Sequence, residues 1–184
     1  MTQRQTHTVV IAGHRRDLPL FEVAPGIHIA IFNMLGDTEI VQAAAKALAE
    51  RLPRETDTLV TAEAKSIPLA HAMAVETKRP YVVLRKSFKP YMGETVSAET
   101  LSITTGQPQT LYLDEKDRPL IDGKKVVIVD DVISTGSTLQ GMRLIIERAG
   151  GQLLATAAVF TEGERARWKD IIALGHLPVF TDEP

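Results

Sequence analysis

The sequence predicts an α/β protein in which helices flank a parallel β-sheet. The first observation is that short apolar runs alternate with helical segments from residue 37 to residue 160. The second is the uninterrupted apolar run at 126–129, which is typical of a strand buried on both faces. The third is a helical pattern at 138–149 that closes at Gly150 and leads into another apolar run at 153–160. A repeated strand–helix–strand order indicates one parallel sheet with right-handed crossovers.

The remaining elements follow from hydrophobic spacing and from helix ends. Asp37 is the expected N-cap of the first helix, and Pro53 ends it. Pro68 suits the first turn of a second helix. The segment 85–113 has no helical period, and its two β-like pieces flank Gly106-Gln107-Pro108, which predicts a hairpin. The segments predicted in this way are helices at 37–52 and from residue 68, strands at 58–61 and 81–84, and hairpin strands at 100–104 and 110–113.

Composition limits both the class of protein and its partners. A chain of 184 residues with 44% apolar and 24% charged residues fits one globular domain. It has no cysteine, which excludes disulfides, thiolate zinc sites and cysteine nucleophiles. A net charge of -2 predicts neither nucleic-acid nor membrane binding. No apolar run approaches a membrane span, and the start lacks the apolar core of a signal peptide, so a cytoplasmic location is expected.

The stretch 126–138 carries the strongest functional signal. It reads Val-Val-Ile-Val-Asp-Asp-Val-Ile-Ser-Thr-Gly-Ser-Thr, so two carboxylates end a buried strand and a loop of small hydroxylated residues leads into a helix. Open α/β sheets place ligands at this end of their strands, and a helix N-terminus attracts anions. The stretch therefore indicates a site for a phosphorylated sugar. The alternative, an ordinary turn whose Asp and Ser only cap the helix, suits any one of these residues better than all of them together.

This stretch resembles the signature of the type I phosphoribosyltransferases, which bind 5-phosphoribosyl-1-pyrophosphate (PRPP). Neither a Walker A spacing nor a GxGxxG pattern occurs in the chain. The resemblance implies one domain over residues 1–184, with a small hood from 1–36 and 160–184 and a flexible β-hairpin loop at 87–110. It also implies that Asp130 and Asp131 face the ribose hydroxyls and that Val132 and Ile133 contact the base. The residues that it implies around the 5-phosphate are Ser134, Thr135, Gly136, Ser137 and Thr138.

Two further segments are similar to the adenine-type branch of this family. The stretch 61–66 corresponds to its pyrophosphate loop and implies pyrophosphate contacts from Ala64, Lys65 and Ser66. Lys65-Ser66 replaces the usual Arg-Gly, which keeps a cation and loses the fork geometry of arginine. The basic segment 85–90 resembles one that reaches the pyrophosphate of a neighbouring subunit, which implies a homodimer; the alternative is a solvated run of charges. The cations concerned are Arg85, Lys86 and Lys89.

Two departures from the adenine pattern concern the base. His28-Ile29-Ala30-Ile31 stands where adenine enzymes carry Phe-Arg-Asp, and Ile103-Thr104-Thr105-Gly106 stands in place of Leu-Glu-Tyr-Gly. The predicted function is transfer of the phosphoribosyl group of PRPP to a purine, adenine first, with release of pyrophosphate in nucleotide salvage. The alternatives are another base such as xanthine, hypoxanthine or orotate, and a non-catalytic PRPP-sensing regulator.

The expected mechanism needs no covalent nucleophile, and the chain contains neither GxSxG nor HExxH. Mg²⁺ is the expected cofactor, held mainly by PRPP and water, with no direct protein ligand. Asp130 and Asp131 are expected to orient the sugar and counter its developing positive charge, while Lys65 offsets the charge of the departing pyrophosphate. His71, on an apolar helical face, is expected to pack in the core or at its boundary.

Overall fold

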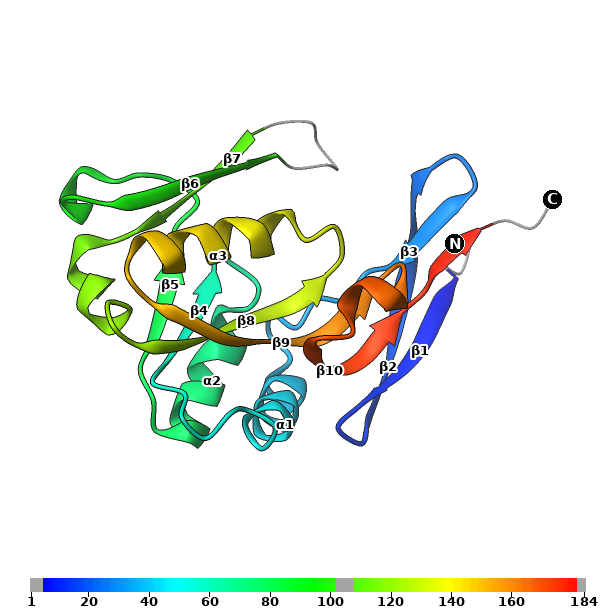
Figure 1. The fold of residues 1–184 in the computed structure, drawn as a ribbon. Helices are drawn as coiled ribbons and strands as arrows, with labels where there is room; N and C mark the ends of the chain where they lie inside the picture. The colour runs from blue at the N-terminus through cyan, green and yellow to red at the C-terminus, as the bar shows by residue number, and fades with distance from the viewer. Residues whose placement is uncertain (1–4, 102–107, 182–184) are drawn as a thin grey trace.

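A five-stranded parallel sheet forms the centre of the protein (Figure 1). The computed structural model describes residues 5–101 and 108–181. The strand order is β10-β9-β8-β4-β5, and all four neighbouring pairs are parallel, which confirms the predicted fold class. The strands are β4 (Thr58–Ala62), β5 (Tyr81–Leu84), β8 (Lys125–Ile133), β9 (Gln152–Glu162) and β10 (Ile171–Leu177).

Helices cover both faces of this sheet (Figure 1). Helices α1 (Thr38–Ala49) and α2 (Ile67–Thr77) pack on one face, and α3 (Ser137–Arg148) packs on the other. Side chains of β8 alternate between the two resulting cores: Val127 and Val129 belong to the α1–α2 core, Val126 and Ile128 to the α3 core. All four are fully buried, which confirms the prediction of a strand covered on both sides.

The helix starts follow the local signals in the sequence, whereas α1 ends at Ala49, before the predicted end at residue 52 and before Pro53. Asp37 is the N-cap of α1, and its Oδ1 accepts a hydrogen bond of 3.2 Å from the amide of Ile40. Arg16 of the second strand also binds Asp37, with Nε 2.7 Å from Oδ2, and these hydrogen bonds lower the pKa of Asp37. Pro68 lies in the first turn of α2, as predicted. A single aspartate thus both caps α1 and attaches the N-terminal strands to it.

The predicted hairpin is present as an antiparallel pair packed over α3 (Figure 1). It consists of β6 (Val96–Leu101) and β7 (Pro108–Leu113). Its first strand begins four residues earlier than predicted, because Ala98 and Thr100 are buried in the contact with α3. Residues 102–107, which include the predicted turn and the Thr104-Thr105 departure, lie outside the described residues.

A second, antiparallel sheet lies beside the end of the central sheet at which β8 and β9 finish (Figure 1). We call it the hood: β1 (Thr6–Ile11), β2 (His14–Ala24), β3 (Ile27–Ala30) and β11 (Val179–Thr181), in the order β1-β2-β3-β11. Its strands were not predicted individually, because much of β2 is exposed and carries no clear alternation of apolar residues. Three short 3-10 helices complete the described fold, at Pro90–Met92, Glu115–Leu120 and Arg165–Trp168.

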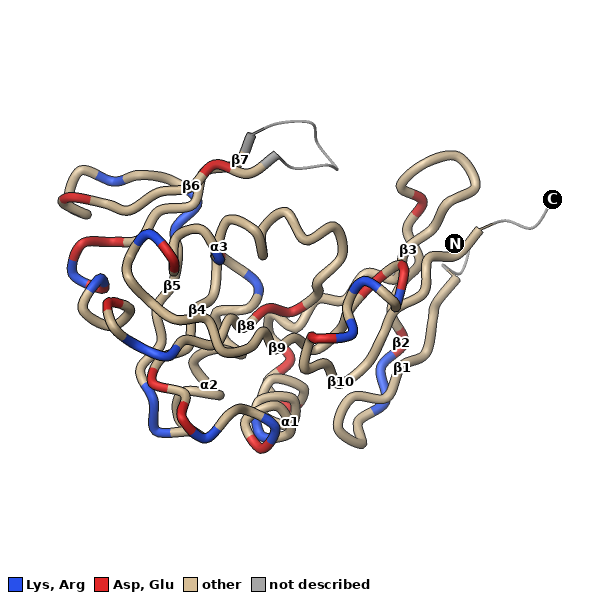
Figure 2. The backbone as a smooth tube through the Cα atoms, in the orientation of Figure 1, with Lys and Arg blue, Asp and Glu red and all other residues tan. Residues whose placement is uncertain are grey.

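Charged residues of both signs are interspersed along the chain (Figure 2). Lysines and arginines alternate with acidic residues on the outer loops of the central domain, as the net charge of -2 suggests. Among the helices of the described residues, none has the length and apolar character needed to cross a membrane.

Candidate active site

The strand order of the central sheet reverses between β4 and β8, and the predicted site residues meet at this point. The chain runs outward from β4 to β5 on one side and from β8 to β9 and β10 on the other. The loops that follow β4 and β8 therefore diverge and leave a crevice at the carboxyl ends of the strands, where open α/β sheets bind ligands. The loop after β4 carries Ala64, Lys65 and Ser66, and the end of β8 carries Asp130 and Asp131.

The acid pair is joined to the loop after β4 through Ser66. The hydroxyl of Thr61 donates to Ser66 Oγ at 2.8 Å, and the buried Ser66 hydroxyl is hydrogen-bonded to Asp130. The amide of Asp131 donates to Asp130 Oδ1 at 2.9 Å. Burial, and after it the negative charge of Asp131, raises the pKa of Asp130 to about 7. A positively charged ligand or a donating hydroxyl in the crevice would therefore favour the ionised form of Asp130.

The loop after β8 forms a small cavity at the start of α3. Gly136 is the N-cap residue with a left-handed φ of 84° and has no side chain to cap the amides of the first turn, and the amide of Ser137 donates to Thr135 Oγ1 at 3.4 Å. Thr135 Oγ1 and Ser137 Oγ lie 3.1 Å apart beside these amides. Amides and hydroxyls directed at one small space suit an anion. This loop pocket, of about 40 Å³, is lined by Asp130, Val132, Ile133, Ser134, Thr135, Gly136, Ser137, Thr138 and Leu139.

A larger cavity adjoins the loop pocket and reaches the hood. This hood pocket, of about 220 Å³, is lined by Ile29, Ala30, Ile31, Phe32, Lys65, Asp131, Val132, Ser134 and Glu162. Val132 and Ser134 line both pockets, so the two pockets adjoin at the end of β8. Ile133 lines only the loop pocket, and its side chain packs in the α3 core. Of the two residues assigned to the base, Val132 therefore lies beside the larger space.

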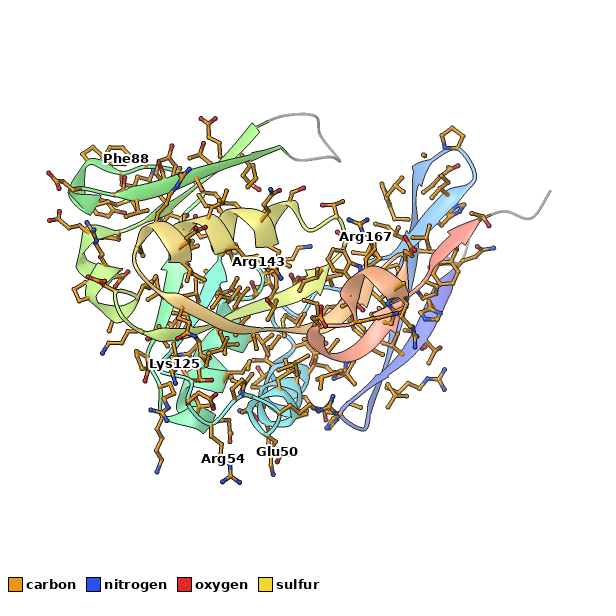
Figure 3. The ribbon with its side chains drawn as sticks, viewed as in Figure 1. Glu50, Arg54, Phe88, Lys125, Arg143 and Arg167 are labelled. Atoms are coloured by element: carbon orange, nitrogen blue, oxygen red, sulfur yellow. The ribbon has the colours of Figure 1, made fainter. Side chains whose placement is uncertain are left out.

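Sequence reasoning missed Arg167 and Trp168, which lie against the loop pocket. Arg167 Nη2 donates to the carbonyl of Thr135 at 3.4 Å (Figure 3), and its guanidinium lies 4.9 Å from the centre of the Trp168 ring. Trp168 in turn lies so close to Gly136 that a Cβ there would be 3.0 Å from Cη2. The only sequence signal was two arginines beside the single tryptophan, with no spacing that connects them to residues 134–138.

The basic segment after β5 stays apart from both pockets within one chain. Arg85 forms an ion pair with Glu63, and hydrogen bonding to Tyr91 followed by the charge of Glu63 raises the pKa of Arg85. The amide of Lys86 also donates to Glu63 Oε2, at 2.8 Å. None of Arg85, Lys86 and Lys89 is among the residues that line either pocket. The structure thus brings Lys65 to the crevice and leaves these three cations outside it.

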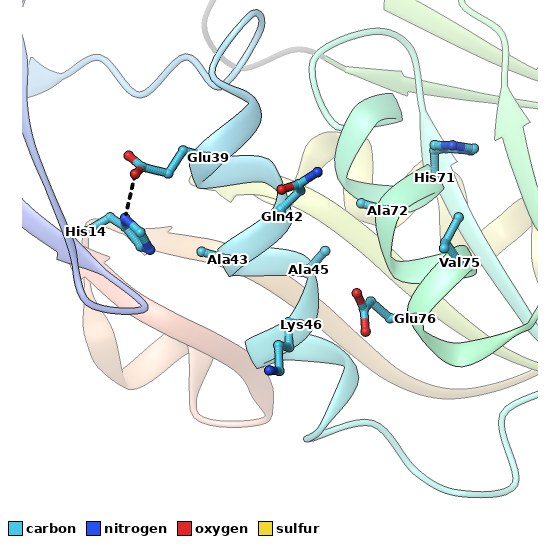
Figure 4. Close-up of a pocket in the computed structure, with 10 residues that line it drawn as sticks. All are labelled: His14, Glu39, Gln42, Ala43, Ala45, Lys46, His71, Ala72, Val75 and Glu76. Carbon is cyan, nitrogen blue, oxygen red and sulfur yellow. Dashed lines mark ion pairs between the residues drawn. The ribbon is translucent and has the colours of Figure 1, made fainter.

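The most voluminous described cavity lies elsewhere, between α1, α2 and the β1–β2 turn (Figure 4). It measures about 830 Å³, and His14 Nδ1 lies 3.3 Å from Glu39 Oε1 at its rim. None of the predicted site residues lines it, so its size does not identify the active site. His71, which lines this cavity, is exposed and packs edge-on against Tyr81 of β5. Its prediction as a core or boundary residue was wrong, because it is not among the α2 residues that are buried against the sheet.

The acid pair fits a magnesium ion that is held mainly by its ligand. No group of three histidine or acidic side chains suited to a metal occurs among residues 5–101 and 108–181. Magnesium usually binds through one or two carboxylates together with phosphate oxygens and water. Asp130 and Asp131 place two carboxylates beside pockets suited to an anion, where they could hold such an ion through its water and phosphate ligands.

Comparisons with known proteins agree with this geometry. The family described as "Phosphoribosyl transferase domain" matches residues 33–177. A hypoxanthine/guanine phosphoribosyltransferase of Methanococcus voltae is 33% identical over 150 residues, which is 81% of this chain and 73% of that protein. The purine biosynthesis transcriptional repressor PurR of Bacillus subtilis is 31% identical over 143 residues, covering 77% of this chain and 49% of the repressor.

Solved structures show the same fold at lower identity. An adenine phosphoribosyltransferase of Thermoanaerobacter pseudethanolicus has a TM-score of 0.66 at 22% identity, covering 94% of this chain and 95% of that chain. An adenine phosphoribosyltransferase of Rhodothermus marinus has a TM-score of 0.65 at 23% identity, covering 94% of each chain. At such identities the likeness concerns the fold.

Proposed function

Because the chain belongs to the phosphoribosyl transferase domain family, we propose that it transfers the phosphoribosyl group of PRPP to a purine base and releases pyrophosphate. One observation carries the proposal: the acid pair, the start of α3 and Lys65 border two adjoining pockets, at the point where the strand order of the sheet reverses. That arrangement offers separate contacts for a ribose, a 5-phosphate and a pyrophosphate.

The reaction breaks the bond between C1 of the ribose and the pyrophosphate oxygen while positive charge grows on the ring. Asp130 and Asp131 hold the ribose hydroxyls and counter that charge. Amides and hydroxyls of residues 134–138 anchor the 5-phosphate, and Ala64, Lys65 and Ser66 contact the pyrophosphate, whose departing charge Lys65 offsets. Arg167, beside Thr135, adds positive charge next to the 5-phosphate. Most of the rate enhancement in this scheme comes from positioning.

Magnesium is the proposed cofactor, and Asp130 and Asp131 are the residues that would hold it through PRPP and water. When bound, it supplies charge neutralisation of the pyrophosphate. Ionised Asp130 suits this role. Because the pKa of Asp130 is raised to about 7, part of the binding free energy of the ligand offsets the free energy needed to ionise Asp130 near neutral pH.

A 6-oxopurine is the base that we propose, in place of the adenine expected from sequence. The relatives that share at least 30% identity with most of this chain include hypoxanthine/guanine enzymes. The adenine enzymes among the solved structures share less than 25% sequence identity with this chain. Their likeness therefore supports the fold and gives no information on the base.

The direct test is a pyrophosphate-release assay with PRPP, Mg²⁺ and a panel of guanine, hypoxanthine, xanthine, adenine and orotate. We expect release with a 6-oxopurine and little from PRPP alone. The matched variants are Asp131→Asn, which should lose PRPP affinity, and Asp122→Asn, an exposed aspartate outside both pockets, which should not. Absence of PRPP binding by the unaltered protein with magnesium present would contradict the proposal.

A second candidate, a PRPP sensor without turnover, is favoured by the likeness to the Bacillus subtilis repressor. The alignment covers half of that repressor. A sensor would bind PRPP tightly and release no pyrophosphate with any base. The same panel therefore separates the two functions.

The proposed enzyme works as one domain, 1–184, located in the cytoplasm, with the 87–110 segment closing over the site. Deleting the whole segment would remove β6, whose Ala98 and Thr100 are buried against α3. We therefore propose replacing only 102–107 by Asn-Gly, because Leu101 and Pro108 are already opposite each other and this pair forms a tight hairpin turn. Turnover should fall while PRPP affinity is kept; equal loss of both would contradict a closing role.

A homodimer is also proposed, in which Lys89 reaches the pyrophosphate of the neighbouring subunit. Exposed Phe88 and Tyr91 flank Lys89, and apolar side chains at such a position favour a protein contact. Light scattering should give about twice the chain mass of 20.2 kDa. Mixing inactive Lys89→Ala with inactive Asp131→Asn should restore up to about a quarter of the activity, because half of the protein pairs as mixed dimers with one intact site each. No recovery would contradict the role across the interface.

A further inference from the structure

Glu162 places a carboxylate in the hood pocket, and nothing in the sequence singled it out. It is the last residue of β9 and half-buried. Within the described parts of the chain, no hydrogen bond or ion pair reaches its carboxylate, and burial alone raises the pKa of Glu162. A partly desolvated carboxylate without a hydrogen-bond partner costs free energy. Such a group in a ligand pocket therefore indicates a ligand that supplies hydrogen-bond donors.

The backbone around Glu162 is held on three sides. Thr161 Oγ1 lies 2.9 Å from Nδ1 of His176, and Nε2 of the same ring lies 3.0 Å from the carbonyl of Gly163. A carbonyl only accepts, so Nε2 carries a proton and donates. Trp168 Nε1 donates to the carbonyl of Glu162 itself at 2.9 Å. The residue is therefore fixed in place while its side chain stays available, as expected of a preorganised contact.

The position of Glu162 in the sheet matches the side from which the base attacks. β8 holds the acid pair, β4 with its loop lies on one side of it, and β9 with Glu162 lies on the other. A base that displaces the pyrophosphate directly approaches C1 on the face opposite the departing pyrophosphate. The hood covers this side of the sheet, because residues 29–32 of β3 and the segment after it line the hood pocket. The pairing of β11 with β3 ends at Ile29, so β11 does not pair with residues 30–32.

We infer that Glu162 recognises the base by accepting hydrogen bonds from N1–H and the 2-amino group of guanine. An ionised carboxylate has two acceptor oxygens and no donor, and these two donors of guanine lie side by side. Hypoxanthine offers only N1–H. Adenine turns the lone pair of N1 toward the carboxylate, which repels it. This role rests on the proposed transferase function and orders the bases as guanine, then hypoxanthine, then adenine.

The test compares kcat/KM for the three bases in the unaltered protein and in Glu162→Gln, with PRPP and Mg²⁺ saturating. We expect guanine to lose about 100-fold, hypoxanthine less, and adenine to be unchanged or improved, since a site built for an N–H group discriminates strongly by that group. The loss should appear in KM for the base, with PRPP affinity unchanged. 1-Methylguanine, which lacks N1–H, should be equally poor with both proteins.

Glu164→Gln is the matched control, because Glu164 is exposed, two residues further on and outside the hood pocket. A thermal midpoint of Glu162→Gln equal to or above that of the unaltered protein would exclude a merely structural role, since the substitution removes a destabilising charge. Turnover with an unchanged order of bases in Glu162→Gln overturns the role of Glu162 alone. No turnover by the unaltered protein with any base overturns the proposed function, and this role with it.

Discussion

The loop pocket and the hood pocket share an edge and are built in different ways. The loop pocket is formed almost entirely by consecutive residues, from Asp130 to Leu139. The hood pocket draws its lining from four separate segments: β3 and the residues after it, the loop after β4, the end of β8 and the end of β9. One is a local structure that the chain makes by itself, and the other exists only when distant segments meet.

This difference suggests a division of roles between the two pockets within the proposed function. A contiguous loop can be kept whole while the rest of the sequence changes, and in the proposed function it binds the 5-phosphate, which is the same for every base. In a pocket assembled from several segments, the residues of one segment can be substituted without changing those of the others. We therefore expect substitutions in the loop pocket to act on PRPP alike with every base, and substitutions in the hood pocket to act on the choice of base.

The largest effect should come from a Cβ at Gly136. Gly136 and Gly36 have φ values of 84° and 82°, so Ala strains either backbone by about 1–2 kcal/mol. Only at Gly136 does the added Cβ meet a neighbour, Cη2 of Trp168 at 3.0 Å; at Gly36 nothing lies within 4 Å. Gly136→Ala should weaken PRPP binding at least about 100-fold (about 2.7 kcal/mol) in calorimetry, and Gly36→Ala should not. Equal losses would show that strain alone acts, which would undo the comparison.

The next effect concerns Asp130. Its pKa is raised from 3.8 to about 7, so the folded protein holds this proton more tightly than the unfolded chain does. The free energy of unfolding therefore falls as pH rises from about 4 to 7, and Asp130→Asn should lack that fall. The variant should be more stable at pH 8, by up to about 4 kcal/mol for a shift from 3.8 to about 7, and bind PRPP about 30-fold more weakly. Denaturant unfolding at several pH values measures the first quantity.

Asp131→Asn is the comparison for this prediction. It removes only the second cause of the raised Asp130 pKa, so the fall in stability with pH should become shallower without vanishing. If Asp130→Asn keeps the full pH dependence, the buried carboxylate is not its source.

A smaller effect is expected at Lys65, which lines the hood pocket and belongs to the predicted pyrophosphate loop. Removing a cation that offsets the departing charge should lower kcat/KM for PRPP about 10-fold in Lys65→Ala, alike for every base. Lys124→Ala, an exposed lysine outside both pockets, is the control. A change in the order of bases would instead assign Lys65 to base recognition.

The smallest effect should come from His176, which touches neither pocket and holds Thr161 and Gly163. Losing two hydrogen bonds in His176→Ala should cost about 1–2 kcal/mol of stability and raise KM for guanine about 3-fold. PRPP affinity should stay the same, because the loop pocket lies on another strand. Equal changes for guanine and PRPP would mean that the two pockets are not independent.

The sequence alone determined the fold class and the loop pocket. Val126 to Val129 form a strand buried on both faces because an apolar residue at every position suits no other place in a sheet. Asp37 and Pro68 mark helix starts through interactions within one turn. Asp130 through Thr138 lie together because they are consecutive, so a local pattern was enough to predict their proximity.

Only the tertiary structure decided the contacts between segments. Glu162, His176 and the Arg167–Trp168 pair come together through the parallel pairing of β9 with β10 and the turn between them, and no spacing in the sequence encodes such proximity. The ion pair of Arg85 with Glu63 likewise depends on β4 and β5 ending side by side. Local hydrogen bonds and hydrophobic periodicity act over a few residues, whereas the residues that line the hood pocket are brought together by packing between strands far apart in the chain.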